Sequence, residues 1–202
     1  MSSQNSFFII GIILLLVLMG AGICSTISAV ILSKSILYRY YDSIRLAYTL
    51  LIIMSTLSFF TWTILLIMYI AGLYTGEFDD NVNNLTLNDI EFLQTYQSYV
   101  LEELLLWVLI FVTIICFFLG VMNVVAATII GTTNNSGLAP VFPSDTDTSV
   151  GEATTFSIIA CVLGFLACLF AIIQTTLYWN IREARFENKT LLGQRVIVDK
   201  DL

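Results

Sequence analysis

Residues 7–33 read FFIIGIILLLVLMGAGICSTISAVILS and contain no Asp, Glu, Lys or Arg. About 20 consecutive apolar residues are enough to cross the hydrocarbon core of a bilayer. Three further charge-free stretches follow along the chain: Leu46–Gly76, Leu104–Ser144 and Ala153–Ile181. The sequence therefore predicts an all-α membrane protein with four transmembrane helices in a small bundle, with spans at about residues 7–33, 46–75, 99–131 and 153–179.

The first apolar run has a second interpretation, as a secretory signal peptide. Residues 1–6 carry no basic side chain, and the run is about twice the usual length of a signal-peptide core. We therefore expect residues 1–202 to form one integral, multi-pass membrane domain, in a membrane that the sequence does not identify.

Charged side chains are unevenly distributed among the segments outside the spans. The chain has 15 acidic and 8 basic residues and a net charge of −7. Residues 77–103 hold seven acids and no base, whereas the bases gather in residues 34–45 and 182–200. With four spans these basic groups lie on opposite sides of the membrane, so the positive-inside rule leaves the orientation open.

The segment before the third span is predicted to be helical. Asn88 and Glu91 match a capping box, and apolar residues recur at helical spacing as far as Leu104. Residues 76–98 are thus expected to form an acidic loop and an amphipathic stalk, so that the third helix extends beyond the membrane. A helix that lies flat at the interface, with a bend near Ser98, is the alternative.

Two further segments complete the predicted organisation. Residues 132–152 contain both prolines and form a loop between the third and fourth spans. Residues 180–202 form a charged tail, in which the fourth helix is expected to stop near Gly193. Beyond that point, residues 195–199 are expected to be unstructured or to add a strand to a partner.

Small side chains recur at helical spacing inside the spans. Helices associate within membranes through close backbone approach and interhelical hydrogen bonds, and small residues permit both. The residues predicted to pack helices together are Ala21, Ser25, Ala29, Asn123, Ala127, Ala160, Gly164, Ala167, Ala171 and Gln174.

Two amides lie deep in the third and fourth spans. Because an unpaired amide in hydrocarbon is costly, Asn123 and Gln174 are expected to bond to another helix. The candidate partners are hydroxyls of the second span: Thr56, Ser58, Thr61 and Thr63. The alternative is that the amides line a permeation path.

Tyr69 and Tyr178, near the ends of their spans, are assigned to the interfacial aromatic belt.

The composition excludes most catalytic chemistry. The chain has no histidine, no charged residue within a span except Glu102 and Glu103 at the start of the third, and four cysteines that all lie inside the spans. We therefore expect no catalytic, cofactor-binding or metal site and no nucleic-acid partner. Asn84, in the sequence Asn84-Leu85-Thr86, is a candidate glycosylation site.

These features favour a non-enzymatic membrane scaffold or anchor. Its partners would be membrane lipid and other protein subunits of a larger assembly, bound through the stalk, the loop and the tail. That assembly would be a membrane complex or a viral envelope and capsid. The alternative is an oligomeric channel or pore subunit, whose acidic residues 77–103 would concentrate cations.

Overall fold

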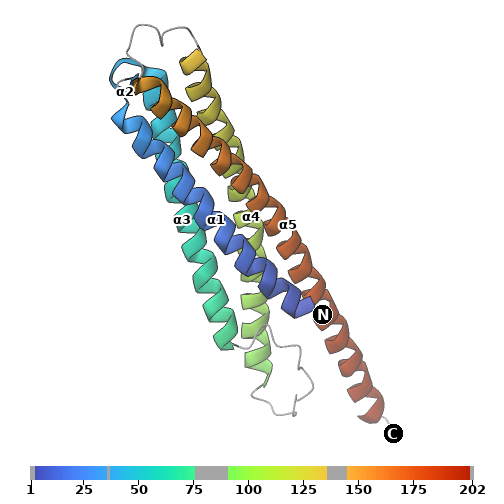
Figure 1. Ribbon diagram of the computed structural model, residues 1–202. Coiled ribbons are helices and arrows are strands. Elements are labelled where there is room, and N and C mark those ends of the chain that lie inside the picture. Colours follow the sequence, from blue (N-terminus) through green and yellow to red (C-terminus); the bar gives the residue numbers. More distant parts are fainter. Residues whose placement is uncertain (1–2, 36, 76–90, 136–144, 201–202) are drawn as a thin grey trace.

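A computed structural model describes residues 3–35, 37–75, 91–135 and 145–200, with side-chain environments for residues 6–35, 37–70, 103–133 and 149–183. These residues form long helices and one short helical turn (Figure 1). The elements are α1 (Ser3–Lys34), α2 (Leu37–Tyr40), α3 (Asp42–Thr75), α4 (Glu91–Asn135) and α5 (Asp145–Lys200).

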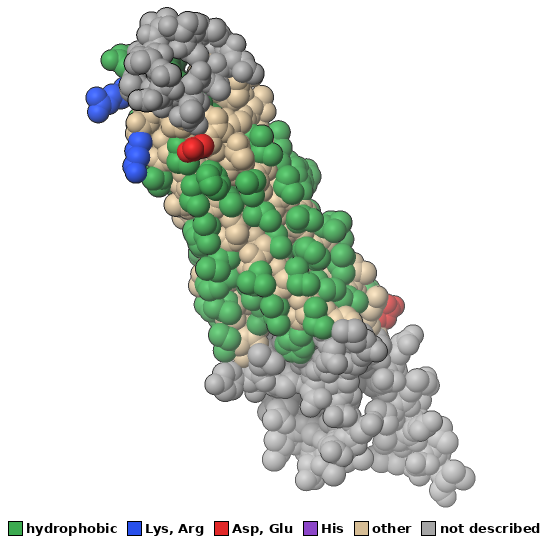
Figure 2. All heavy atoms as spheres, in the orientation of Figure 1, with side chains coloured by type: hydrophobic (Ala, Val, Ile, Leu, Met, Phe, Trp, Pro, Cys, Tyr) green, Lys and Arg blue, Asp and Glu red, His purple; other side chains and the backbone are tan. Residues whose placement is uncertain are grey.

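The four long helices are each long and apolar enough to cross a membrane, which confirms the predicted fold class. The apolar spans are Ser6–Lys34, Asp42–Ile70, Glu103–Thr133 and Ser149–Glu183. Large hydrophobic side chains cover the outside of the bundle at these levels (Figure 2). Because lipid solvates such a surface and water does not, the chain is a multi-pass integral membrane protein.

The long helices run antiparallel and alternate in direction along the chain (Figure 1). Both α1 and α4 pack against α3 and against α5, which gives the order α1, α3, α4, α5 around the bundle. The N- and C-terminal ends of the described chain lie at the same end of the bundle, and α2 lies at the other end.

Two helices are longer than the apolar spans that they contain. α4 is one continuous helix of 45 residues that begins at Glu91, ahead of its span at Glu103. The third helix therefore extends beyond the apolar span as predicted, with no break at Ser98. Asn88 and Asn84 lie outside the described residues, as do Pro140 and Pro143.

The C-terminal helix differs from its prediction at both ends. α5 begins at Asp145, within the predicted loop. It continues past Gly193, where the helix was expected to end, to Lys200, through residues expected to be unstructured or to add a strand to a partner. A glycine inside a helix costs about 1 kcal/mol relative to alanine. Leucine and glutamine neighbours that favour helix offset this cost, so one glycine does not end α5.

The core consists of two apolar clusters stacked along the bundle. The cluster nearer the chain termini includes Phe7, Leu14, Leu65 and Leu109, all buried. The cluster nearer α2 is built from smaller side chains and includes Leu32, Ile44, Leu51, Ala126 and Ala153. Polar side chains lie between these clusters and beside them.

Candidate functional site: polar contacts inside the bundle

The small residues of α5 lie together on its buried face. The five predicted packing residues of α5 are buried, and so is Ser157 on the same face: Ser157, Ala160, Gly164, Ala167, Ala171 and Gln174. Their alternating spacing of three and four residues keeps them on one side of a helix. This face packs against both α1 and α4, so α5 contacts two neighbours along one continuous surface.

At Gly164 the backbone of α5 lies close to the backbone of α4. A Cβ atom added at Gly164 would lie 2.8 Å from the backbone nitrogen of Gly120 and 2.9 Å from its Cα. Real Cβ atoms essentially never approach so closely, and the neighbouring atoms belong to backbone, which cannot rotate away. Glycine at position 164 is therefore required by the distance between the two helices.

Phe165 lies beside this contact, across Gly120. A Cβ at Gly120 would meet the Phe165 ring at 2.9 Å, and the Phe165 ring makes an edge contact with Phe117 at 6.5 Å between centroids. Phe165 lies outside the set of buried small residues, and 41% of it is exposed.

The predicted packing residues of α1 are also buried, and one of them bonds to α4. Ala21, Ser25 and Ala29 are each 1% exposed or less. Ser25 Oγ donates to Asn123 Oδ1 at 3.1 Å, and Asn123 Nδ2 donates to the backbone oxygen of Leu119 at 2.8 Å. Both ends of the Asn123 amide are thus bonded inside the bundle.

Two serines extend this polar layer to α5. Ser157 Oγ donates to the backbone oxygen of Asn123 at 3.3 Å, and Ser28 Oγ donates to the backbone oxygen of Ala153 at 2.7 Å. The layer therefore links α1, α4 and α5 at the level between the two core clusters. Interhelical hydrogen bonds of this kind contribute about 0.6 kcal/mol each on average in membranes.

The second amide bonds to α3, nearer the chain termini. Gln174 Nε2 is hydrogen-bonded to the hydroxyl of Tyr69, and both groups lie against Gly11 of α1. A Cβ at Gly11 would lie 2.5 Å from the Tyr69 hydroxyl and 2.9 Å from Gln174 Nε2. Gln174 Oε1 is buried and has no hydrogen-bond partner among the described residues.

The predicted hydroxyl partners of the amides were wrong, because α3 uses those groups differently. Thr56, Thr61 and Thr63 each donate to the backbone oxygen four residues earlier in their own helix. Ser58 Oγ donates to the backbone oxygen of Leu18 at 2.7 Å and so joins α3 to α1. Threonine readily bonds within its own helical turn, which leaves few hydroxyls for distant partners.

Other predicted positions also differ. Ala127 is only partly buried, and Ala126 is the fully buried alanine of α4 at that level. Tyr178, assigned to the interface, is buried against Phe7 with 5.9 Å between ring centroids. Tyr69 likewise serves inside the bundle, and no sequence pattern distinguished it from the interfacial tyrosines. Asn84 lies outside the described residues.

The polar side chains described above join the helices of the bundle to one another. No group of three or more His, Cys, Asp or Glu side chains in the described part of the chain could hold a metal ion. The chain matches no protein-family model, no curated protein and no solved structure.

Proposed function

We propose that this protein is a non-enzymatic membrane scaffold, in which the bundle is the anchor and the ends of two long helices bind partner proteins. One observation carries this proposal. Both α4 and α5 extend past their apolar spans at the same end of the bundle, where the chain termini also lie (Figure 1).

The interior of the bundle supports an anchoring role. Ser25, Asn123 and Ser157 bond to one another and to backbone atoms. Fully buried leucines fill the space between this layer and the Tyr69–Gln174 pair. Leucines packed in this way exclude water and fix the helices relative to one another.

The charges on the two extensions support protein recognition. In the sequence, residues 91–102 add acidic side chains to α4, and residues 182–200 place basic and acidic side chains on α5. Charged groups held on helices outside a membrane favour complementary protein surfaces. A membrane complex and a viral envelope are both settings in which such an anchor serves.

The α5 extension is the segment to test. A variant that ends after Glu183 keeps every apolar span and removes the extension. We expect it to resist alkaline extraction from membranes as the full chain does, and to lose the proteins that chemical cross-linking joins to the full chain in its native membrane. The matched control keeps the length and composition of residues 184–202 in shuffled order. Cross-linking that persists in the truncated variant would remove this extension from the proposal.

A channel subunit is the second candidate, and Gln174 favours it. Its Oε1 atom is buried with no partner in the described part of the chain, as expected of a group that meets water or an ion in another assembly state. In planar bilayers this candidate predicts a cation conductance that Gln174→Leu and Asn123→Leu alter. Bilayers that stay silent at verified incorporation would contradict it.

A further inference from the structure

The turn between α1 and α3 has a fixed depth in the membrane. The first apolar span ends at Lys34 and the second begins at Asp42. Only seven residues separate these two positions, so both spans reach the same membrane surface through a short connection. The connection, which includes α2, therefore lies in the headgroup layer of one leaflet.

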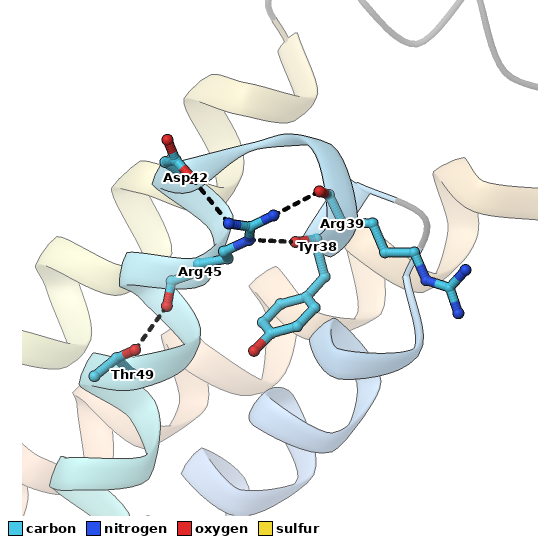
Figure 3. A network of polar contacts seen from close by, with 5 residues as sticks. All are labelled: Tyr38, Arg39, Asp42, Arg45 and Thr49. Carbon is cyan, nitrogen blue, oxygen red and sulfur yellow. Dashed lines mark hydrogen bonds and ion pairs between the residues drawn. The ribbon is translucent and has the colours of Figure 1, made fainter.

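Arg45 holds this turn in one conformation (Figure 3). Its Nε donates to the backbone oxygen of Tyr38 at 3.1 Å, and its Nη2 donates to the backbone oxygen of Arg39 at 2.7 Å. Its Nη1 donates to Asp42 Oδ1 at 3.2 Å. The Arg45 guanidinium thus donates hydrogen bonds to two backbone carbonyls of α2 and forms an ion pair with the Asp42 carboxylate. Its positive charge is therefore neutralised within the turn.

Buried neighbours fix the rest of the turn. Ser35 and Leu37 are buried, and Ser35 Oγ accepts the backbone N–H of Leu37 at 3.2 Å. The Tyr38 ring makes an edge contact with the Tyr48 ring of α3 at 5.1 Å between centroids. The backbone positions of the neighbouring basic residues are set by these contacts rather than by their own side chains.

Lys34 and Arg39 are the other two basic residues of this turn, and their side chains are available to bind a ligand. Both are exposed, and neither forms an ion pair with another described residue. In Figure 3 the Arg39 side chain points away from the Arg45 network. Figure 2 shows basic side chains projecting at this end of the molecule, next to the apolar surface of the bundle. Tyr40, 69% exposed, lies beside Arg39 in the sequence.

We propose that Lys34 and Arg39 bind the headgroup of an anionic phospholipid in the leaflet that surrounds this turn. A guanidinium donates two parallel hydrogen bonds to a phosphate, and an ammonium adds a compact positive charge. A tyrosine ring favours the headgroup level of a membrane. Asp42, the acidic residue within this turn, is bonded to Arg45, so its charge is already paired.

Native mass spectrometry of the full chain in mild detergent tests this site. Phosphatidylglycerol and phosphatidylcholine of identical acyl chains are titrated separately, and the affinity of the first bound lipid is measured. Each basic side chain near a membrane surface contributes enough to change affinity about fivefold. We therefore expect Lys34→Gln and Arg39→Gln each to weaken phosphatidylglycerol binding about fivefold, and the double variant roughly 25-fold. Phosphatidylcholine binding should not change.

Three controls separate this site from general charge effects. Arg182→Gln removes the same charge at the opposite end of the bundle and should leave phosphatidylglycerol binding within about twofold of the original chain. Soluble glycerol phosphate at the lipid concentration should not displace the bound lipid. Arg39→Lys, which keeps the charge and the fold, should lose less affinity than Arg39→Gln. The proposal is overturned if the double variant binds phosphatidylglycerol as the original chain does, if Arg182→Gln loses as much affinity, or if glycerol phosphate displaces the lipid.

Discussion

Gly164 determines how closely α5 approaches α4, because the backbone of Gly120 occupies the place where a side chain would begin. In a membrane, such contact between backbones replaces the hydrophobic effect that drives helices together in water. The loss of this contact affects van der Waals packing over the whole α4–α5 interface rather than at one residue.

We predict that Gly164→Ala destabilises the bundle by about 1–3 kcal/mol, the usual cost of overpacking a core. Gly151→Ala in the same helix is the matched control, because the Cβ that it adds meets no side chain and no other helix within 4 Å among the described residues. That control should be neutral or should stabilise α5 by up to about 1 kcal/mol through helix propensity. Unfolding in mixed detergent micelles measures both variants. Equal stabilities would contradict the close approach at Gly164.

The Tyr69–Gln174 pair gives a second prediction at this scale. Tyr69→Phe removes the partner of Gln174 Nε2 and leaves a buried amide unpaired, so it should cost about 1–3 kcal/mol. The double variant Tyr69→Phe/Gln174→Leu removes both polar groups and should recover most of the lost stability. The same unfolding assay measures the three chains. If the double variant is less stable than Tyr69→Phe, the amide has another role at this position.

Residue spacing predicted the buried face of α5 but not every contact that the face makes. Small residues three and four positions apart must share a side of a helix, and this constraint is local. Ala126 and Ala127 both satisfy helical spacing from Asn123, and the rotation of α4 against its neighbours decides which one is buried. The partners of Asn123 and Gln174 depend on the axial positions of separate helices, which no single segment specifies.

Among the helices, α4 shows best how well the sequence predicts where a helix begins. The capping pattern and the helical spacing of apolar residues predicted that this helix starts outside the apolar span, and the described helix starts at Glu91. The same type of local signal failed at Gly193, because a glycine ends a helix only when the residues after it do not continue the helix.

A distance measurement tests the continuity of α4. Spin labels at positions 91 and 128 of a straight helix lie about 55 Å apart at 1.5 Å per residue. A bend of about 90° at Ser98 would shorten this distance to roughly 46 Å. Pulsed electron paramagnetic resonance resolves the two values, and noncanonical amino acids should carry the labels because four native cysteines would also react. The shorter distance would favour a helix that lies flat on the membrane.

For the whole molecule, the four spans place both described ends of the chain on one side of the membrane (Figure 1). Protease sites added at the N-terminus, within residues 76–90 and at the C-terminus should be cut together in sealed vesicles. A site within residues 136–144 should be cut only from the other side. Cleavage of the two terminal sites from opposite sides would contradict an even number of spans.

The hydrogen bonds within the bundle also bear on how the helices associate while the chain is being synthesised. α1 and α3 are joined by Ser58 and by a 2.6 Å contact between Thr26 and Ser55, and α4 and α5 meet at their glycines. Ser25–Asn123 and Tyr69–Gln174 connect one of these helix pairs to the other. When only α1 and α3 have been inserted, hydrogen bonds already join these two helices. At that stage Asn123 and Gln174 have not yet been synthesised. Until the two pairs associate, Asn123 and Gln174 lack these partners. Because an unpaired amide in hydrocarbon is costly, both side chains favour association of the pairs.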